Sequence, residues 1–425
     1  MSNATYDTAY IDKKRWITCL LQILIGTASS FVYVLSVFIG PLVELKGWDA
    51  NEILFTFTVA MWVGSPSIII GGKICSKIGP KKVICVAGLL YGLAIVVSAF
   101  VTSVAAFIVL QGVVASFFMF CISVATLDNI GTLYPDKRGA ATGLVLAGMG
   151  IGSAVIAPLA QYITDNSSVV VSIVGQGVAY AVIMVVCGAL IMEAPKGYKP
   201  AGWEPEKITE TADTLNGNQQ RGPDVGWIKM LKTPVFWIVF FALLLINIVG
   251  SMPISNGAYM TELALGVSGA TAAWIFSAVT VSCAVGNYLG GWIADKIGTM
   301  KTLAMVGALN MIFAAVAGTA GLNSLTVWGI ALIVIGFDYG CLTTIMPVIA
   351  MNIFGEKNFG VNYGIIGLNA IVVNAIGPQI TLMEDMRMGM LSAAVVALVG
   401  SLLALLGAKA VSNYIKKAWA ERQEA

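Results

Sequence analysis

The sequence contains no histidine, and only 11% of its 425 residues are charged, whereas a soluble globular domain carries about 25%. Without an imidazole, a conventional catalytic triad is excluded, and any proton-linked step must use carboxylates or water. The sequence also lacks a phosphate-binding loop, and its seven cysteines include no CxxC pair of the kind that binds metals. We therefore expect a protein that is not an enzyme, does not use ATP, and holds no metal or other cofactor.

Long apolar runs recur from Trp16 to Ala410, and 58% of all residues are hydrophobic. Each run is close to the roughly 20 residues that an α-helix needs to cross about 30 Å of hydrocarbon. The first run is too long for the core of a signal peptide, so we expect it to be retained. The sequence therefore predicts an all-α, multi-pass protein of the cytoplasmic (inner) membrane, with the lipid bilayer and not nucleic acid as its partner. The twelve predicted transmembrane helices are 16–40, 52–72, 83–103, 105–132, 139–163, 168–192, 234–259, 270–293, 302–321, 325–352, 361–383 and 388–411.

A polar stretch separates the first six spans from the last six. It predicts an N-terminal six-helix bundle at 1–192, a cytoplasmic linker at 193–233 and a C-terminal six-helix bundle at 234–425. The Pro, Gly, Asn and charged residues of the linker are typical of an irregular segment, with a short interfacial helix as an option. With both termini in the cytoplasm, every Lys and Arg except Lys46 and Arg387 falls on the cytoplasmic side. The positive-inside rule therefore predicts cytoplasmic termini.

Two segments on the predicted cytoplasmic side occur twice. GGKICSKIGPKK at 71–82 returns as GGWIADKIGTMK at 290–301, and YPDKRGAATG at 134–143 has a fainter counterpart in FGEKNFGVNYG at 354–364. Because the copies lie between corresponding spans, we expect two pseudo-symmetric six-helix halves related by an axis along the membrane normal. Transporters with this plan alternate access by rocking one half against the other.

The pattern G-x-x-x-D-[KR]-x-G-x-x-[KR], between spans 2 and 3 and again between spans 8 and 9, resembles the signature loop of the major facilitator superfamily. In that loop glycines permit a tight turn and close helix contact, and charges latch the two halves on the inner side. The first copy departs from the pattern at Ser76, where Asp is usual, whereas the second keeps Asp295, so the latch is expected to rest on the second copy. The alternative is that these loops are only basic membrane anchors. The inner-gate residues that the resemblance implies are Lys77, Gly79, Asp295, Lys296 and Gly298.

The segments LYPDKRGAATGLVLAGMGIGSAVIAPLAQ at 133–161 and FGEKNFGVNYGIIG at 354–367 resemble the oxalate:formate antiporter family, which is related to the monocarboxylate transporters. The resemblance covers nearly the whole chain and implies a substrate site near the membrane midplane. A dicarboxylate carrier of that family is expected to hold its anion with an Arg in helix 8 and a Lys in helix 11. Those positions fall on Asn287 and Ala370 here, so both cations are missing.

Asp338 is a carboxylate in the middle of the apolar run WGIALIVIGFDYGCLTTIMPVIAMNIFG. It lies roughly 20 Å into its span, near the midplane, at a helical rise of about 1.5 Å per residue. A charge there costs about 2.5–3.5 kcal/mol on insertion scales, so such residues usually face a cavity and have a function. We interpret Asp338 as the counter-ion of a substrate amine or as a protonatable coupling site. The structural alternative is a protonated acid that bonds to neighbouring hydroxyls or amides.

Asp128, about two turns from the inner end of the fourth span, is a second candidate. It is either a further proton or cation site or an inner-gate residue that pairs with Lys137 or Arg138. The resemblance places the helix-1 aromatic of the family on Tyr33 and a helix-10 aromatic on Tyr339. The residues predicted to bind substrate are Tyr33, Asn287, Asp338, Tyr339, Thr343 and Asn369.

These features predict a secondary active transporter that moves a small organic solute by symport or antiport. A dicarboxylate would meet Asp338 and no fixed cation, and like charges in a low dielectric repel by several kcal/mol. We therefore predict a zwitterionic, cationic or neutral substrate and not oxalate. A proton-coupled symporter or antiporter of a lactate- or formate-like monocarboxylate is the alternative, and a transporter-like membrane sensor is the alternative from another class. A single chain of this architecture is expected to function as a monomer.

Overall fold

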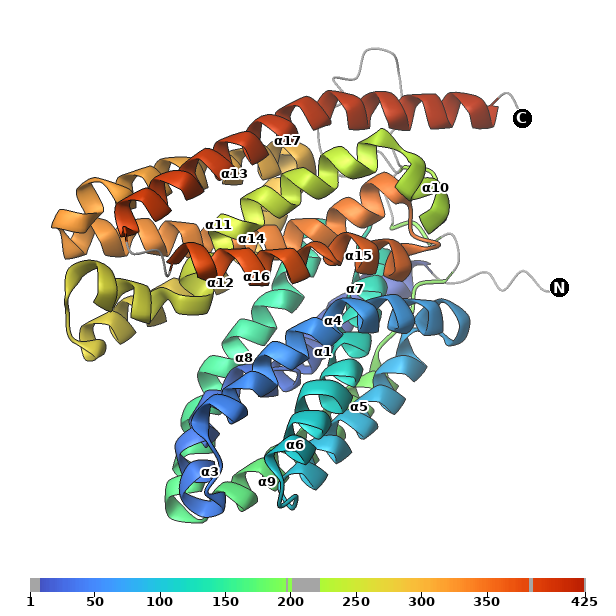
Figure 1. The fold of residues 1–425 in the computed structure, drawn as a ribbon. Coiled ribbons are helices and arrows are strands. Elements are labelled where there is room, and N and C mark those ends of the chain that lie inside the picture. The colour runs from blue at the N-terminus through green and yellow to red at the C-terminus, as the bar shows by residue number, and fades with distance from the viewer. Residues whose placement is uncertain (1–7, 196–197, 201–221, 382–384, 424–425) are drawn as a thin grey trace. The chain divides into compact units, whose positions relative to one another are not determined.

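The computed structural model of the protein describes residues 8–195, 198–200, 222–381 and 385–423, and all of their regular structure is helical (Figure 1). Among these residues, eight helices are long and apolar enough to cross a membrane. The all-helical membrane architecture is therefore confirmed, whereas the number of twelve spans and the cytoplasmic position of the termini stay predictions.

Within each half of the chain, the helices follow one another with short connections. The first half contains α1 (Thr8–Ala28), α2 (Phe31–Val34), the 3-10 turn η1 (Leu35–Phe38), α3 (Ile39–Lys46), α4 (Ala50–Ile78), α5 (Pro80–Ser98), α6 (Val104–Phe107), the π-helical segment η2 (Ile108–Ala115), α7 (Ser116–Leu133), α8 (Arg138–Asn166) and α9 (Val169–Leu190). The second half contains α10 (Trp227–Lys232), α11 (Pro234–Leu265), α12 (Gly269–Ile297), α13 (Thr299–Gly318), the 3-10 turn η4 (Ala320–Asn323), α14 (Leu325–Phe354), α15 (Phe359–Gly367), α16 (Asn369–Thr381) and α17 (Met386–Gln423).

Four of the long helices begin at a Ser or Thr that caps the first turn. The side-chain oxygens of Ser168, Thr233, Ser268 and Ser324 each accept a hydrogen bond from the amide three residues further on. Such caps satisfy amides that have no partner within the helix. These caps explain why the first residues of α9, α11, α12 and α14 lie within one residue of the first residues of the corresponding predicted spans.

Two predicted spans are broken in the structure. Span 16–40 is interrupted after α1, where Ser29 Oγ donates to the carbonyl of Ile25 over 2.9 Å and Ser30 Oγ to that of Thr27 over 2.8 Å. These hydroxyls compete with the backbone hydrogen bonds of a helix. Span 361–383 is divided into α15 and α16 directly after Gly367, a residue of low helix propensity.

The chain folds into two compact units. Unit 1 takes its described residues from 1–135, 147–203 and 358–365, and unit 2 from 136–146, 204–357 and 366–425. The first turns of α8 therefore belong to unit 2, and the first turns of α15 belong to unit 1. The predicted division into two bundles joined by a linker at 193–233 stays a prediction, because residues 201–221 lie outside the described residues.

The internal repeat is visible in the packing of each unit. In unit 1, α4 packs against α7 and α5 against α9, and in unit 2, α12 packs against α14 and α13 against α17. The repeated loops also share one backbone conformation: Gly79 has φ 88° and ψ 154°, and Gly298 has φ 94° and ψ 149°. Only glycine adopts this region readily, so both copies need glycine to turn from one helix into the next.

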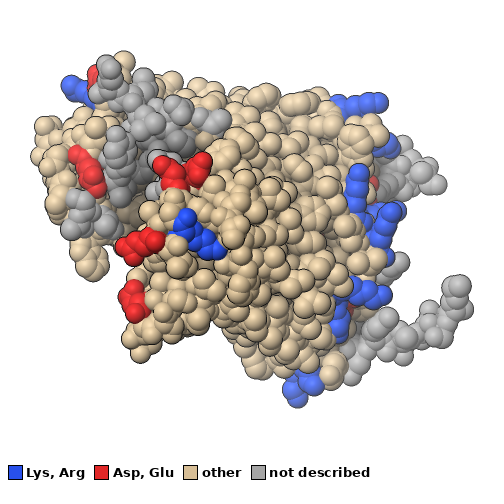
Figure 2. All heavy atoms as spheres, turned by 60° about the horizontal axis from the view of Figure 1, so that its bottom comes forward, with Lys and Arg blue, Asp and Glu red and all other residues tan. Residues whose placement is uncertain are grey.

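The surface carries many large apolar side chains. Val86 and Leu89 on α5 are more than half exposed, and so are Leu405 and Leu406 on α17. Most of the surface drawn in Figure 2 is neither acidic nor basic. These exposed helix faces suit contact with lipid tails, as expected for a protein that spans a membrane.

Candidate functional site

Asp338 lies in the middle of α14, where that helix packs against α12. A Cβ atom added to Gly340 would lie 2.0 Å from the carbonyl oxygen of Cys283, and one added to Gly336 would lie 2.6 Å from a methyl group of Val279. Glycines at these positions therefore allow the two helices to approach closely. The side chain of Asp338, next to this contact, is 0% exposed.

Neither carboxylate oxygen of Asp338 has a hydrogen-bond partner among the described residues. The structural alternative is a protonated acid that is hydrogen-bonded to neighbouring hydroxyls or amides. No hydrogen bond of this kind to Asp338 is found among the described residues. A buried charge without a partner costs far more free energy than a buried neutral group. The geometry therefore leaves a carboxyl group whose charge must be neutralised by a proton or by a ligand.

Asn287 and Thr343 are brought together where α12 meets α14. Thr343 Oγ1 donates to the side-chain oxygen of Asn287 over 2.6 Å, and Thr344 Oγ1 donates to the backbone oxygen of Asn287 over 2.8 Å. Asn287 is 7% exposed. These two predicted binding residues therefore join the helices in this structure, one to two turns from Asp338 along α14.

The other predicted binding residues lie on three helices. Tyr339 follows Asp338 on α14 and packs against α11. A Cβ atom added to Gly250 of α11 would lie 3.3 Å from the Cβ of Tyr339. Asn369, at the start of α16, is buried, and its Nδ2 lies 3.8 Å from the sulfur of Met346 on α14. Tyr33 is part of α2, but its side chain lies outside the described residues. Asn369 and Tyr339 thus both contact unit 2 elements that surround Asp338.

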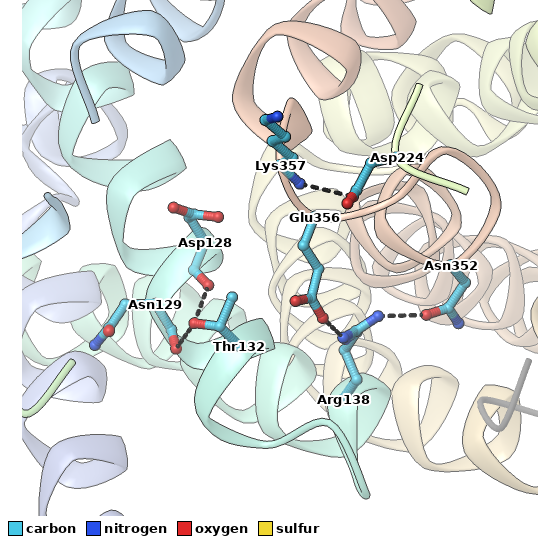
Figure 3. Close-up of polar contacts among 8 residues, drawn as sticks. All are labelled: Asp128, Asn129, Thr132, Arg138, Asp224, Asn352, Glu356 and Lys357. Atoms are coloured by element: carbon cyan, nitrogen blue, oxygen red, sulfur yellow. Dashed lines mark hydrogen bonds and ion pairs between the residues drawn. The ribbon is translucent and has the colours of Figure 1, made fainter. Parts of the chain in front are cut away.

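Asp128 lies on α7 in unit 1, beside a buried thiol of α4. Cys75 Sγ is 3.5 Å from Asp128 Oδ2. Figure 3 shows the hydrogen bond that Thr132 Oγ1 donates to the backbone oxygen of Asp128 over 3.0 Å. The predicted pairing of Asp128 with Lys137 or Arg138 stays a prediction.

Arg138, the first residue of α8, is buried in a polar cluster at one end of unit 2. It is 1% exposed, its Nη1 donates to Asn352 Oδ1 over 2.7 Å, and its Nη2 forms an ion pair with Glu356 (Figure 3). Sequence reasoning placed Arg138 in the gate region but did not assign it these partners. The signal was the paired motifs YPDKRG and FGEKNFG, which contain Arg138 and Glu356.

Asp295, the acid kept in the second signature loop, caps the same end of α8. Its two oxygens accept hydrogen bonds from the amides of Gly139 and Ala140, each over 2.8 Å. Burial raises the pKa of Asp295 to about 6, and the two amides and the charge of Arg138 oppose that rise. Asp295 lies just after the predicted span 270–293, and both of its oxygens act as hydrogen-bond acceptors.

The first signature loop lacks this cap. Ser76 occupies the position of Asp295, and its Oγ donates to the carbonyl of Lys73 in its own helix over 2.9 Å. The glycines nevertheless approach in both units: a Cβ atom on Gly72 would lie 2.4 Å from Gly360, and one on Gly291 would lie 2.0 Å from the Gly139 oxygen. The charges are therefore asymmetric, whereas the glycine contacts are symmetric. Of the remaining predicted gate residues, Lys77 and Lys296 are exposed, with Lys296 Nζ 3.7 Å from the centre of the Trp292 ring.

The chain before α10 is bound to the end of α14. The amide of Gly222 donates to the Asn352 oxygen over 2.7 Å, and that of Val225 to the Phe354 oxygen over 3.0 Å. Asp224 Oδ1 accepts a hydrogen bond from the amide of Lys357 over 3.1 Å (Figure 3). Asn352 therefore holds Arg138 through its side chain and Gly222 through its backbone.

Comparison with known proteins identifies the relatives of this chain. A model of the Major Facilitator Superfamily matches residues 18–378. The MFS-type transporter YhjX of Escherichia coli (strain K12), whose function is uncharacterised, is 22% identical over 84% of this chain and 85% of its own length. The oxalate:formate antiporter of Oxalobacter formigenes is 24% identical over 82% of this chain and 80% of its own length. Monocarboxylate transporter 13 of Rattus norvegicus is 27% identical over 69% of this chain and 62% of its own length.

Solved structures share the fold. The E. coli fucose:proton symporter FucP superposes with a TM-score of 0.65, covering 93% of this chain and 98% of its own, at 14% identity. The proton:xylose symporter XylE superposes with a TM-score of 0.68, covering 96% of this chain and 97% of its own, at 16% identity. At these identities the likeness concerns the fold alone.

Proposed function

The chain belongs to the Major Facilitator Superfamily, and from this premise we propose that it couples the transport of a small organic solute to protons, with Asp338 as the group that binds and releases the proton. Secondary transport by alternating access is general for this fold. The identity of the solute and the nature of the coupling are the parts that we propose.

The observation that carries the proton role is the burial of Asp338 without a partner. Its side chain is 0% exposed, and neither oxygen has a hydrogen-bond partner among the described residues. A proton is the smallest ligand that can neutralise a carboxylate, and it needs no open pocket to reach its site. In a conformation that exposes α14 to water, the same carboxylate would be hydrated and would release the proton more readily. Alternating burial and exposure would then couple proton movement to transport.

The solute is proposed to carry no more than one negative charge. Asn287 and Ala370 occupy the positions where the resemblance implies cations, and α14 contains no Lys or Arg. A dianion would therefore enter a site with an acid and without a compensating fixed charge, which is unfavourable in a low dielectric. Although one relative is named an oxalate:formate antiporter, we propose that this chain does not carry oxalate.

A monocarboxylate that moves with a proton agrees best with the names of the relatives, which include several monocarboxylate transporters. One anion and one proton enter together as a neutral pair, so no fixed cation is required. Neutral donors can hold a single carboxylate, and Tyr33, Asn287, Tyr339, Thr343 and Asn369 are proposed for that role. The binding of an amine or zwitterion to Asp338 is the second candidate, favoured by the lack of basic residues in α14.

We also propose that the inner gate lies at the predicted cytoplasmic ends of α8, α12 and α14. Asp295 supports this assignment through its two bonds to the start of α8. Gly79 and Gly298 supply the turns that precede α5 and α13. Lys77 and Lys296 are proposed to add basic charge there, and Asp128 to act as a second acid of the gate. Function as a monomer in the inner membrane stays part of the proposal.

Thermal stabilisation of the purified protein tests the solute class, because a ligand that binds the folded state raises its melting temperature. We would compare formate, lactate, oxalate and matched amines and amino acids at about pH 5.5 and about pH 7.5. Stabilisation by monocarboxylates at the lower pH alone is the expected result. Stabilisation by amines or zwitterions that is lost in Asp338→Asn would instead establish the counter-ion role. Strong stabilisation by oxalate at both pH values would contradict the proposed solute class.

A further inference from the structure

A second buried polar side chain lies in the same core as Asp338. Asn310, in the middle of α13, is 0% exposed, and neither its amide nitrogen nor its amide oxygen has a hydrogen-bond partner among the described residues. Buried polar atoms are usually bonded, and each unsatisfied one costs free energy. Asn310 is therefore unusual in the same way as Asp338, on a helix that packs directly against α14.

The depth of Asn310 follows from contacts along α11, α13 and α17. Gly407 of α17 lies against both Ile238 and Met300, which shows that these two residues are at one level. Further along, Gly307 of α13 lies against Ile246 of α11. The helices α11 and α13 therefore run in the same direction, with Gly307 and Ile246 at the same depth.

One further helical turn along α11 and α13 reaches the depth of both Asp338 and Asn310. Gly250 lies one turn beyond Ile246 on α11 and packs against Tyr339 of α14, the neighbour of Asp338. One turn beyond Gly307 on α13 is the position next to Asn310. These contacts place Asn310 and Asp338 at the same depth to within about one helical turn, roughly 5 Å.

Apolar residues on the faces that carry Asn310 and Asp338 belong to one buried cluster. Ala314 lies one turn after Asn310 on the same face of α13. Ile335 and Ala331 lie one and two turns before Asp338 on the same face of α14. All three apolar residues belong to one buried cluster of unit 2.

Apart from Asp338, no charged residue of the described helices α11, α12, α13, α14 and α17 lies at this level. The charged residues of the helices that pack around α13 and α14 all lie at least nine residues from this level along their helices: Glu262 on α11, Asp295 and Lys296 on α12, Lys301 on α13, and Arg387, Lys409, Lys416, Lys417, Glu421 and Arg422 on α17. The titratable groups close to Asp338 include the phenol of Tyr339, the next residue of α14, and the thiols of Cys341 on α14 and Cys283 on α12. Two amides lie at this level: Asn310 on α13, and Asn247 on α11, whose side-chain oxygen is also without a hydrogen-bond partner among the described residues. Asn310 is the one on which neither amide atom has such a partner.

We propose that Asn310 is the positioning residue for the proton of Asp338, so that the two side chains form a single buried proton site between α13 and α14. This inference rests on the proton role of Asp338 proposed above. A primary amide suits both states of the acid: its oxygen accepts a hydrogen bond from the protonated carboxyl, and its nitrogen donates one to the carboxylate. Neither bond is formed in this structure, where all four polar atoms are without a partner among the described residues, and the proposal is that they form during the conformational cycle.

Infrared spectroscopy of the purified full-length protein tests the pair without a transported solute. Subtraction of the Asp338→Asn spectrum isolates the carboxyl band of Asp338, and the band is followed as the pH is changed. In Asn310→Leu we expect the band of the protonated acid at higher frequency, because a hydrogen bond is lost. We also expect its titration midpoint to rise by about one pH unit, since hydrogen bonds to a charged acceptor are stronger than those to a neutral group.

Gln22→Leu is the matched control, because Gln22 in unit 1 is also 0% exposed with both amide atoms unpartnered among the described residues. It should leave the Asp338 band and midpoint unchanged. The exchanged variant Asn310→Asp with Asp338→Asn should restore a titrating buried carboxyl band. An unchanged band in Asn310→Leu, with a normal Asp338 band in the wild type, would overturn the role of Asn310 alone. A wild-type spectrum without any protonated Asp338 band would instead overturn the proton role of Asp338.

Discussion

Nη1 of Arg138 donates a hydrogen bond of 2.7 Å to the side-chain oxygen of Asn352, so that the first residue of α8 is tied to the last turn of α14. Glu356 supplies the opposite charge, with 27% of its side chain exposed against 2% for Arg138. The guanidinium is thus buried and depends on its partners. Removal of one partner should therefore weaken the attachment of α8.

We expect Glu356→Gln to lower the free energy of unfolding by about 2 kcal/mol, between the values for exposed and fully buried ion pairs. Amide exchange of residues 138–146 should become faster, because Arg138 loses its ion pair with Glu356. The control is Glu44→Gln, which changes an exposed glutamate. Equal melting temperatures of the two variants would contradict the stabilising role of the ion pair.

The contact between Gly291 and Gly139 should not tolerate a methyl group. A Cβ atom on Gly291 would lie 2.0 Å from the Gly139 oxygen, so Gly291→Ala must push α12 and α8 apart at a cost of about 1–3 kcal/mol. Hydrogen exchange at Gly139 and Ala140 should rise accordingly. Gly175→Ala, at a helical position with open space around it, should be neutral or slightly stabilising. If the two variants exchange alike, the close approach of these helices is not required.

The asymmetry of the signature loops predicts a gain of stability from Ser76→Asp. A carboxylate at this position would face the start of α15, as Asp295 faces the start of α8, and would stabilise its amides by about 1 kcal/mol. Exchange of residues 358–365 should slow by about fivefold, whereas Ser76→Ala should leave it unchanged. Unchanged exchange in Ser76→Asp would show that the first loop does not occupy the equivalent place.

Gly222 allows the chain before α10 to lie against α14. A Cβ atom there would lie 2.0 Å from the Ile353 oxygen, so Gly222→Ala should detach this segment and expose the amide of Val225 to exchange. Because Asn352 also holds Arg138, exchange at the start of α8 should rise as well. Gly226→Ala, with open space at its Cβ, is the control. A rise at Val225 without one at α8 would separate the two contacts.

The sequence was sufficient to predict the features that depend on local pattern. Runs of apolar residues located the helices, and the transporter family, with no enzymatic activity, is confirmed by the match to residues 18–378. Gly79 and Gly298, aligned by their motifs, share one backbone conformation. Such features are encoded within short segments and need no knowledge of distant contacts.

Features that depend on distant contacts were not predictable. Arg138 and Glu356 are 218 residues apart. The paired motifs that contain them indicate related positions in the two halves, but they do not indicate that the two side chains form an ion pair. Asn310 gave no signal either, because a single Asn in a membrane helix usually acts only as a modest interhelical contact. Its relation to Asp338 depends on the depth at which α13 and α14 pack. The roles of all candidate site residues stay predictions.

The most direct test of the proton role is uptake into proteoliposomes of the solute identified by thermal stabilisation, with and without an inward proton gradient. We expect the gradient to accelerate uptake by the wild-type protein and to have no effect on Asp338→Asn. Exchange of labelled for unlabelled solute should continue in both, which would show that the variant is folded and binds its solute. An Asp338→Asn variant that responds to the gradient as the wild type does would contradict the assignment of Asp338 as the proton carrier.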